Sequence, residues 1–582
     1  MRAGECVRRC GMTTRTPLAS LDRGFRTTYL DYETLLQQLE AWVWAYPDLV
    51  RLKEMTRTAE GRRVWLLTLG PKPDDVRPAL WLDGNMHASE LCGSSVCLAT
   101  AEAVLALHLG EAGAFDALSP SAQDTIKNSL VHICPRISPD GAEAVLTTGR
   151  WVRSVPRDDR PRSSAARWLA KDMNGDGRSL VMRQEDPTGE YVANDAVDSL
   201  FHIRDIDDEG PFYKLWPEGE IEDFDGDHVP TPDEHSDNYP DLNRNFAYDW
   251  RGEREQVGAG DYPGSEPESR AVLEFARNNP NLFAWVDLHS FGGVGIRPLG
   301  DEADNKMNPS DLAMYRQIGS WLDEHTGYPL VSGFEEFTYS PETPLRGDLS
   351  EWAYRERGCV SLVVELWDLF KRAGLKRPKR FVDHYTHMTR DDQLAVAKWD
   401  AEHNEGRVFR GWERMTHPQL GEVEVGGIDP VVGLWNPPES MLSELCDGMV
   451  QVIGRLLAMA PRLHVDLEVE TLAPDLHRVV CTVENRGYLS TQVLDSAKGL
   501  SVDTAPSARI DGVDVVDVDH IEVGHLDGWG RGRFDGSDTL FAPRSRGTTS
   551  RRVVRFLVRG SGEATVRVGC PRTGWVTERC TL

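Results

Sequence analysis

The stretch Phe283-Ala-Trp-Val-Asp-Leu-His-Ser290 decides the fold. Its apolar run is short and bounded by polar residues, which predicts a strand buried on both faces. Leu130–Cys134 and Val360–Val364 are apolar runs of the same kind. Ala271–Asn278 and Leu312–His325 lie on either side of the first strand and have apolar residues at helical spacing. Strands that alternate with helices indicate an α/β domain with a central mixed sheet flanked by helices.

The same alternation continues towards both ends of this region. Tyr32–Trp44 and Leu91–Leu109 have apolar residues at helical spacing, whereas Val64–Leu69 and Ala79–Leu82 are typical of short buried strands. Met441–Met459 predicts a strongly amphipathic helix, which we expect to end the α/β domain.

Beyond about Pro461 the character of the sequence changes. Apolar and polar residues alternate, as in Val465/Leu467/Val469 and Val554/Phe556/Val558, and turn-rich segments separate such stretches. A period of two predicts half-buried antiparallel strands, and these are typical of a small all-β sandwich. The expected organisation is a flexible leader over residues 1–28, an α/β domain over residues 29–460 and a β-sandwich over residues 461–582.

Composition and charge exclude several classes of protein. The 582 residues include 93 acidic and 65 basic side chains, and the formal net charge of −28 repels phosphate backbones and anionic lipid surfaces. We therefore expect no nucleic-acid partner and no membrane partner. General solubility explains this acidity more simply than attraction of basic substrates does.

Targeting signals and cysteine usage point to the cytoplasm. The N-terminal region has no apolar run long enough for a signal-peptide core, and no stretch approaches the roughly 20 apolar residues of a membrane span. Ten scattered cysteines do not resemble a disulfide framework. Cys570 and Cys580 flank a predicted C-terminal hairpin and are the one pair to check, whereas Cys92 and Cys97 are expected to pack on a helix. The oligomeric state is left open.

A metal-ligand pattern directly follows the predicted strand Ala79–Leu82. In Asp83-Gly-Asn-Met-His87-Ala-Ser-Glu90, a histidine and a carboxylate three residues apart can lie on one face of a helical turn and point at the same ion. His-x-x-Glu is a weak signal by itself, because the same spacing arises by chance as a capping or surface pair.

Two further polar residues end predicted buried strands. A catalytic zinc ion keeps three protein ligands and one open position, and His289 supplies a third ligand at the edge where α/β sheets place active sites. Glu365 ends Val360-Ser-Leu-Val-Val-Glu365, and a carboxylate is costly to bury unless it is paired or used. A core histidine and an ion pair at the sheet edge are the structural alternatives.

Arginine motifs lie between the two histidine motifs. They are Arg150-Trp-Val-Arg153, which follows Pro139-Asp-Gly141, and Asp241-Leu-Asn243-Arg244-Asn245-Phe246. Arginine binds carboxylates through two parallel hydrogen bonds, so one arginine suits a terminal carboxylate and another suits a developing oxyanion. A surface salt bridge is the ordinary alternative for each arginine taken singly.

The order of these motifs resembles that of the M14 zinc carboxypeptidase family, the relatives of pancreatic carboxypeptidase A. The series is His-x-x-Glu, Pro-Asp-Gly, Arg-x-x-Arg, Asn-Arg-Asn-aromatic, Ser-Glu-Pro-Glu at residues 265–268, strand-His-Ser and strand-Glu. The resemblance covers about residues 29–460. It implies one Zn²⁺ per chain, bound by His87, Glu90 and His289.

The resemblance also implies roles for other residues. Glu365 would be the general base and acid, and Arg153 would polarise the scissile carbonyl. Asn243 and Arg244 would hold the terminal carboxylate of the substrate. The implied activity is hydrolysis of the C-terminal bond of a peptide with a free carboxylate, by a zinc-bound water that Glu365 activates.

The sequence departs from the family pattern at three places. Ser89 stands where many relatives have an arginine before the ligand glutamate, which weakens a secondary substrate contact. Ser138 replaces the usual asparagine before Pro-Asp-Gly. Tyr339 is matched to the family's mobile, substrate-binding tyrosine, because Tyr354 follows the structural Trp352 too closely.

An insertion at about residues 155–240 separates Arg153 from Asn243. Its segment Asp172-Met-Asn174-Gly-Asp176-Gly177 matches the start of a calcium loop, but the twelfth position is Arg183 rather than glutamate, which argues against an EF-hand. A Ca²⁺ site of another kind at Asp172, Asn174 and Asp176 and a plain Asp/Gly turn are the two interpretations. We expect the insertion to shape the rim of the cleft.

Two other functions stay open on the sequence alone. The first is an amidohydrolase acting on peptidoglycan stem peptides or on glutamyl side-chain bonds. The second is an inactive peptide- or glycan-binding protein. Leu349–Ser350 are expected to line the S1′ pocket without an obvious fixed charge for a basic side chain, so the preferred C-terminal residue is not determined.

Overall fold

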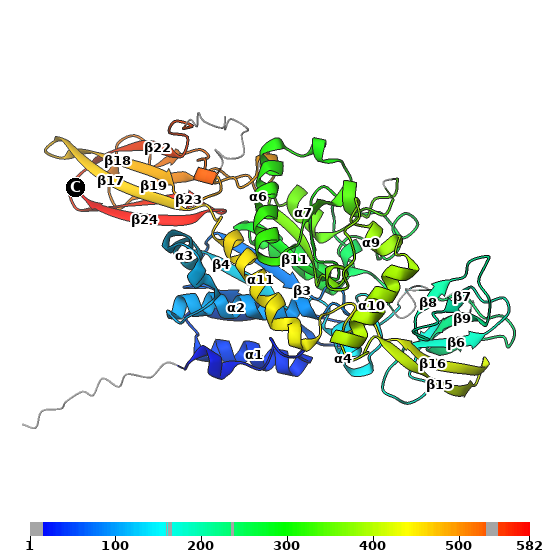
Figure 1. Cartoon of the computed structure of the whole chain (residues 1–582). Coiled ribbons are helices and arrows are strands. Elements are labelled where there is room, and N and C mark those ends of the chain that lie inside the picture. Colours follow the sequence, from blue (N-terminus) through cyan, green and yellow to red (C-terminus); the bar gives the residue numbers. More distant parts are fainter. Residues whose placement is uncertain (1–15, 159, 161–165, 234–237, 341, 531–544) are drawn as a thin grey trace, which may run out of the picture.

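The computed structural model describes residues 16–158, 160, 166–233, 238–340, 342–530 and 545–582. An eight-stranded mixed sheet forms its centre (Figure 1). In sheet order, the strands are β1 (Val50–Arg57), β2 (Arg63–Leu69), β4 (Leu130–Cys134), β3 (Ala79–Gly84), β11 (Leu282–Ser290), β14 (Val360–Leu366), β12 (Val294–Arg297) and β13 (Leu330–Ser332). The four central strands β4, β3, β11 and β14 are parallel. The predicted α/β fold with a mixed central sheet is confirmed.

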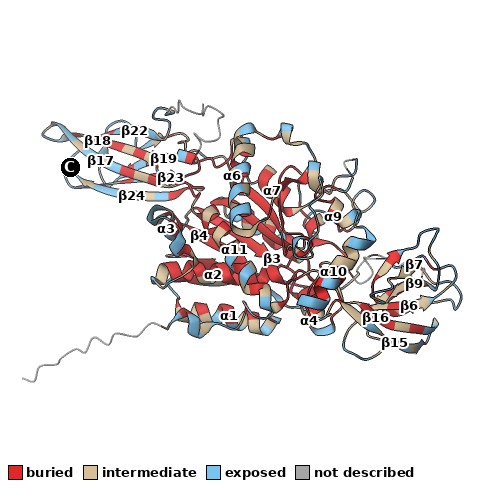
Figure 2. Cartoon of the chain, viewed as in Figure 1, coloured by how far each residue is buried: buried red, intermediate tan, exposed pale blue. Residues whose placement is uncertain are grey.

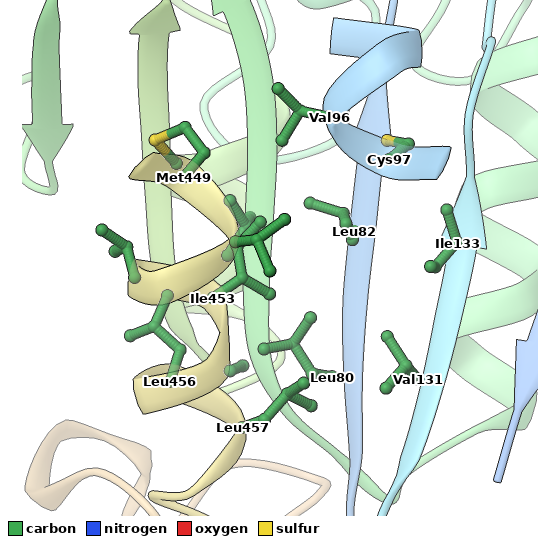
Figure 3. Close-up of a cluster of buried hydrophobic side chains, with 14 of the residues drawn as sticks. Leu80, Leu82, Val96, Cys97, Val131, Ile133, Met449, Ile453, Leu456 and Leu457 are labelled. Atoms are coloured by element: carbon green, nitrogen blue, oxygen red, sulfur yellow. The ribbon is translucent and has the colours of Figure 1, made fainter. Parts of the chain in front are cut away.

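Successive residues of a strand point to opposite faces of the sheet. Both faces of this sheet carry apolar side chains, and helices cover both. On one face, Leu80 and Leu82 of β3 pack in a core with helices α2 (Cys92–Leu109), α6 (Pro309–Thr326) and α11 (Glu439–Leu457). Figure 3 shows Met449, Ile453, Leu456 and Leu457 of α11 beside the β3 and β4 side chains. On the other face, Trp81 and Trp285 stack at 4.8 Å in a core with α5 (Pro267–Asn278) and α7 (Leu349–Arg355).

Helix α2 qualifies the expectation that no segment approaches a membrane span. Its 18 residues have a mean hydropathy of 1.5 and are by length and composition apolar enough to cross a membrane. In the structure, 83% of this segment is buried inside the fold, where α2 packs against the central sheet and beside α11 (Figure 2). A core helix that is hydrophobic all round has this composition.

The prediction of a flexible leader is wrong for residues 16–28. Residues 1–15 lie outside the described part of the chain. Leu18 and Phe25 are 6% and 1% exposed and belong to the main core, next to helix α1 (Tyr32–Ala45). Arg26 forms ion pairs with Glu102 at 2.9 Å and with Asp447 at 2.8 Å. This segment therefore packs on α2 and α11 instead of being flexible.

The region of the insertion forms a second, antiparallel sheet at one side of the α/β domain (Figure 1). Two of its six strands come from far downstream, after β14. In sheet order, the strands are β15 (Phe409–His417), β16 (Gly421–Ile428), β6 (Val181–Glu185), β9 (Phe212–Pro217), β7 (Tyr191–Ala193) and β8 (Phe201–Ile203). Pairing of β16 with β6 ties the insertion to the hairpin at residues 409–428, which the sequence analysis did not predict.

The C-terminal residues form two antiparallel four-stranded sheets around a core of their own. One sheet contains β17 (Leu463–Ala473), β18 (Leu476–Asn485), β22 (Arg551–Arg559) and β20 (Asp514–Val515). The other contains β21 (His520–Glu522), β19 (Ser507–Asp511), β23 (Glu563–Cys570) and β24 (Gly574–Thr581). The all-β C-terminal region agrees with the predicted fold class, while the exact domain boundary at residue 461 stays a prediction. Cys570 and Cys580 are free cysteines.

The β23–β24 turn contacts the amino ends of two central strands. Arg572 is buried and donates hydrogen bonds to the carbonyl oxygens of Leu282, at 2.6 Å, and Arg357, at 2.8 Å. Leu282 begins β11, and Arg357 lies three residues before β14. The C-terminal sheets are therefore held against the strands that carry His289 and Glu365.

Candidate functional site

Three buried side chains meet at the carboxyl ends of β3 and β11. His87 and Glu90 lie on a turn after β3, in which the Glu90 N–H donates to the His87 carbonyl, and His289 lies near the end of β11. Their potential ligand atoms all lie within 4.8 Å of one another. Helix α2 begins only at Cys92, so the pair is placed by a turn rather than by the predicted helix.

The spacing of these atoms fits a zinc ion. His87 Nδ1 lies 2.9 Å from Glu90 Oε1 and 3.0 Å from His289 Nδ1. Ligands at 2.0–2.1 Å from a tetrahedral zinc are about 3.3 Å apart, close to these separations. Two imidazoles and a carboxylate are also ligands that zinc prefers, so the residues present can hold this metal.

Aspartates orient both imidazoles. His87 Nε2 lies 3.2 Å from Asp241 Oδ1, and His289 Nε2 lies 3.0 Å from Asp287 Oδ2. The Asp241 carboxylate is in hydrogen-bond contact with His87 Nε2, and the Asp287 carboxylate lies at ion-pair distance from His289 Nε2. Carboxylates in such positions are typical outer partners of metal-binding histidines and leave Nδ1 to face the ligand group. Sequence reasoning did not assign these aspartates, although Asp241 begins the Asn-Arg motif and Asp287 lies two residues before His289.

The electrostatics of the site favour a cation. Burial alone would raise the pKa of the Glu90 carboxyl, but the neighbouring His87 and His289 lower that pKa to about 2. Burial likewise disfavours a charged His289, yet Asp287 and Glu90 raise its pKa well above the ordinary value. The buried carboxylates around His87 and His289 stabilise positive charge at this point. Such surroundings suit a divalent metal ion.

Glu365 lies beside the candidate metal ligands on the adjacent strand. It is the register partner of His289 in the parallel pairing of β14 with β11. Burial and the charge of Glu90 raise the pKa of the Glu365 carboxyl to about 8, although His289 and Arg153 oppose the shift. A carboxyl group whose pKa lies near neutrality can both accept and donate a proton.

Arg153 is held next to the ligand group. Its Nε donates to Asp241 Oδ2 at 3.0 Å, and its Nη1 lies 3.8 Å from Glu90 Oε1. Asp241 therefore contacts both His87 and Arg153 and fixes their relative position.

Asn243 and Arg244 lie on the short turn after Asp241. The Asn243 Oδ1 accepts the Leu349 N–H at 2.9 Å, which joins this turn to the start of α7. Arg244 Nη1 donates to the Asn243 carbonyl at 2.7 Å. Among the described residues, no carboxylate oxygen lies within 4 Å of the Arg244 guanidinium, and burial lowers its pKa. The guanidinium thus lines the cleft without a salt bridge to the described residues, although the charges of Asp241 and Asp348 partly offset the effect of burial on its pKa.

One cleft brings together all of the site residues proposed from the sequence. They are His87, Glu90, Arg153, Asn243, Arg244, His289, Tyr339 and Glu365. Tyr339 is 54% exposed, and its phenol is near enough to Glu365, Arg153 and Arg244 for their charges to affect its pKa.

Charged side chains line the same cleft as Ser350, one of the two residues expected to form the S1′ pocket. Ser350 lines the cleft, but Arg297, Asp348 and Glu351 line it as well. Arg297 is paired with Asp304, and Glu351 accepts hydrogen bonds from Arg355 and from the Gly300 N–H. Two of the three added charges are therefore already neutralised by the protein.

The predicted Ca²⁺ site at Asp172, Asn174 and Asp176 is not supported. The Asp172 carboxylate accepts hydrogen bonds from the Gly175 and Gly177 N–H groups, at 2.7 and 2.8 Å. Among the described residues, these side chains are not part of a metal-ligand group. The segment is an Asp/Gly turn, the second of the two interpretations.

The fold and the three-ligand group define an α/β protein with a zinc-type metal site at the carboxyl ends of its parallel strands. More specifically, the chain belongs to the zinc carboxypeptidase family, whose model matches residues 35–176 and 232–390. Residues 463–581 match a second family, described as a domain of unknown function (DUF8731).

Individual relatives are distant. A zinc carboxypeptidase of Saccharothrix mutabilis subsp. capreolus is 28% identical over 141 residues, which cover 24% of this chain and 30% of the relative. Carboxypeptidase A4 of Mus musculus is 18% identical over 341 residues, covering 58% and 63% of the two chains. The chain thus spans less than two thirds of these relatives. Among solved structures, the chain is similar to the crystal structure of thrombin activatable fibrinolysis inhibitor. The match covers 76% of this chain and 79% of that one, at 17% sequence identity and a TM-score of 0.43.

Proposed function

We propose that the protein is a zinc carboxypeptidase that hydrolyses the last peptide bond of peptides with a free C-terminal carboxylate. The unpaired Arg244 guanidinium, in the same cleft as the three buried ligands and Glu365, carries this proposal. A buried cation without a direct salt bridge is unfavourable, and a substrate carboxylate supplies that partner through two parallel hydrogen bonds.

Each residue then has a chemical role. Zinc held by His87, Glu90 and His289 would supply Lewis acidity at the scissile carbonyl. The Glu365 carboxylate accepts a proton from the attacking water and returns it to the leaving amine. Arg153 donates hydrogen bonds to the oxygen that becomes negatively charged.

The remaining site residues position the substrate. Asn243 and Arg244 bind the terminal carboxylate and so select the last residue of a chain. Tyr339 lies at the exposed rim of the cleft, and in this proposal its hydroxyl donates a hydrogen bond to the same end of the substrate. Binding of a fixed end group holds the scissile bond at a constant distance from Glu365.

The direct test is incubation of the zinc-loaded protein with a peptide library varied at its C-terminal residue, read by mass spectrometry. The expected result is removal of single residues from free C-termini and not from matched amidated peptides. Equal cleavage of both forms would contradict the exopeptidase assignment. Glutamyl side-chain amides and peptidoglycan stem peptides belong in the same assay, because preferential cleavage of these would support the amidohydrolase instead.

A further inference from the structure

Residues 430–437, which we name the asparagine loop, lie between β16 and α11 and contact the turn that carries Glu90. They are outside residues 35–176 and 232–390, which match the zinc carboxypeptidase model. The loop is closed on itself, because the Gly433 N–H donates to the Asn436 carbonyl at 2.7 Å and the Asn436 N–H donates to the Val431 carbonyl at 3.1 Å. Asn436 is fully buried. The loop therefore presents this side chain at one fixed place.

The Asn436 amide bonds to the main chain on both sides of Glu90. Its Nδ2 donates to the Ser89 carbonyl at 2.7 Å, and its Oδ1 accepts the Cys92 N–H at 2.9 Å. Nδ2 also donates to the Val431 carbonyl at 2.8 Å. Both amide hydrogens and the amide oxygen are thus used, and a rotated amide would bring like groups together. The partners of this side chain fix its orientation.

The contact acts on the peptide unit of Glu90 itself. The Ser89 carbonyl belongs to the unit that joins Ser89 to Glu90, so a hydrogen bond from Asn436 fixes the plane from which the Glu90 side chain starts. The His87 carbonyl is bonded instead by the Asn85 side chain, at 2.9 Å. The two metal ligands of this turn are therefore held by different asparagines.

The bond to Cys92 supplies a cap that α2 does not have in its own sequence. Cys92 begins α2, and the first N–H groups of a helix have no partner within the helix. A Ser, Thr, Asp or Asn directly before the helix usually accepts one of these hydrogens, but Leu91 stands there and offers no side-chain hydrogen bond. The acceptor comes from Asn436, 344 positions along the chain.

The asparagine loop also contacts the strand end that carries Glu365. Trp367 follows Glu365 by two residues, and its Nε1 donates to the Gly433 carbonyl at 3.1 Å. Gly433 has a φ of 112°, and a Cβ atom there would collide with the Asn404 side chain. A glycine is therefore required for the loop to reach both the ligand turn and the strand of the candidate base.

The insertion holds the loop from another side. Asp429, directly before the loop, is buried. It forms ion pairs with Arg178 of the insertion and with Arg410 of β15, at 2.9 Å each. The insertion is thus joined to the metal-ligand group through the asparagine loop.

We propose that Asn436 is a positioning residue for the metal ligand Glu90 and acts through the Ser89 carbonyl and the Cys92 N–H. This inference rests on the zinc site of the proposed function and assigns part of its support to a segment outside the family match. Metal ligands must lie within about 0.2 Å of their coordination distances, so a Glu90 backbone that loses these two bonds holds zinc less tightly.

The test is zinc affinity, measured by competition with a chromogenic chelator. Asn436→Ala should raise the zinc dissociation constant about tenfold or more, because outer partners of metal ligands typically contribute about 10–100-fold. Asn436→Asp keeps the size of the side chain and the acceptor for Cys92, but turns an oxygen towards the Ser89 and Val431 carbonyls. It should weaken zinc binding at least as much, and an unchanged affinity in either variant would overturn the inference.

A matched asparagine separates positioning from folding. Asn485 is buried at the end of β18, where its Nδ2 donates to the Leu489 carbonyl at 2.8 Å and its Oδ1 accepts the Gly487 N–H at 3.0 Å. Asn485→Ala should lower the urea midpoint of unfolding about as much as Asn436→Ala does, but should leave the zinc dissociation constant unchanged. An equal loss of zinc affinity in both variants would reveal general destabilisation and would contradict the positioning role.

Cobalt(II) in place of zinc gives a spectroscopic readout, because its visible absorption depends on the arrangement of its ligands. At full occupancy, Asn436→Ala should shift the visible bands, whereas Asn485→Ala should reproduce the wild-type spectrum. Identical spectra of all three proteins would show that Asn436 does not position a ligand.

Hydrogen exchange of the unaltered protein tests the same coupling even if a variant fails to fold. Zinc loading should slow amide exchange in residues 430–437 as well as in residues 87–92, because the coupling between the metal and the loop is reciprocal. Slower exchange in residues 87–92 alone would count against the inference.

The proposed function and this inference can fail separately. If the zinc-loaded wild-type protein cleaves no peptide but its zinc affinity depends on Asn436, the positioning role is supported and the hydrolase is not. If hydrolysis occurs and Asn436→Ala binds zinc as tightly as the wild type, only the inference is wrong.

Discussion

His289 and Glu365 are direct register partners on the adjacent parallel strands β11 and β14. Both strands are parallel and in register from Ala284 and Val360 onwards, so their carboxyl ends present the two functional side chains at the same level. The sheet pairing thus sets the distance between a candidate metal ligand and the candidate general base. Arg572 contacts the opposite, amino ends of the same strands.

Removal of the Glu365 carboxylate should abolish turnover without loss of the metal. Because Glu365 does not belong to the ligand group, Glu365→Gln should retain one zinc per chain and lose about 10²–10⁴ in kcat. Zinc content is measured by elemental analysis and kcat with a free-carboxylate peptide. Glu324→Gln, on the exposed side of α6, is the control, and a fully active Glu365→Gln variant would rule out the base assignment.

Arg244→Ala should mainly raise KM for peptides with a free C-terminus. Loss of charged hydrogen bonds worth about 1.5–3 kcal/mol corresponds to roughly ten- to a hundredfold. Steady-state kinetics on free and amidated versions of one peptide measure the effect, with the exposed Arg316→Ala on α6 as the control. An unchanged KM for the free form would remove Arg244 from the substrate site.

Asp287→Asn should weaken zinc binding. The carboxylate orients His289 from 3.0 Å, and loss of such an outer partner typically costs about 10–100-fold in metal affinity. Competition with a chromogenic chelator measures the zinc dissociation constant. Asp74→Asn, at an exposed surface ion pair, should not alter it, and equal affinities of Asp287→Asn and wild type would contradict the orienting role.

Arg572→Ala should destabilise the protein. The change deprives the carbonyls of Leu282 and Arg357 of a buried donor, which corresponds to a loss of about 2–4 kcal/mol in the free energy of unfolding. Urea unfolding followed by tryptophan fluorescence measures this loss, with Arg555→Ala on the exposed side of β22 as the control. A change within about 0.5 kcal/mol of that control would show that the contact does not hold the C-terminal sheets in place.

Glu268 should make stability depend on pH. Neither of its buried carboxylate oxygens has a hydrogen-bond partner in another described residue, and burial raises its pKa from 4.5 to about 7. Between these values the folded protein keeps a proton that the unfolded chain has released. The free energy of unfolding should therefore fall by about 1.4 kcal/mol per pH unit as pH rises through this window, and the loss should be complete above pH 7.

Comparison with Glu268→Gln isolates this contribution. The amide does not titrate, so the difference in unfolding free energy between the two proteins should change by about 3 kcal/mol between pH 4.5 and pH 8, in favour of the variant at high pH. Urea unfolding at both pH values provides the measurement. A difference that does not vary with pH would show that Glu268 is not buried as a carboxylic acid.

The strands of the central sheet were predictable because they are buried on both faces. β3, β4, β11 and β14 each contain a run of mainly apolar residues, so local composition suffices to identify them. β15 and β16 are half-buried and contain Arg414, Glu422 and Glu424, so their apolar signal is weak. The pairing of β16 with β6 of the insertion joins residues about 240 positions apart, which local periodicity does not encode.

The sequence by itself determined the family, the α/β class and the eight cleft residues, because side chains of distinct chemistry recur there in a specific order. Only the tertiary structure decided that residues 16–28 pack on the core, that Asp287 orients His289, and that Trp435 joins Phe291 beside the metal-ligand group. Those relationships depend on contacts between distant segments. Their energies come from burial and geometry, which exist only after the strands have paired and the helices have packed.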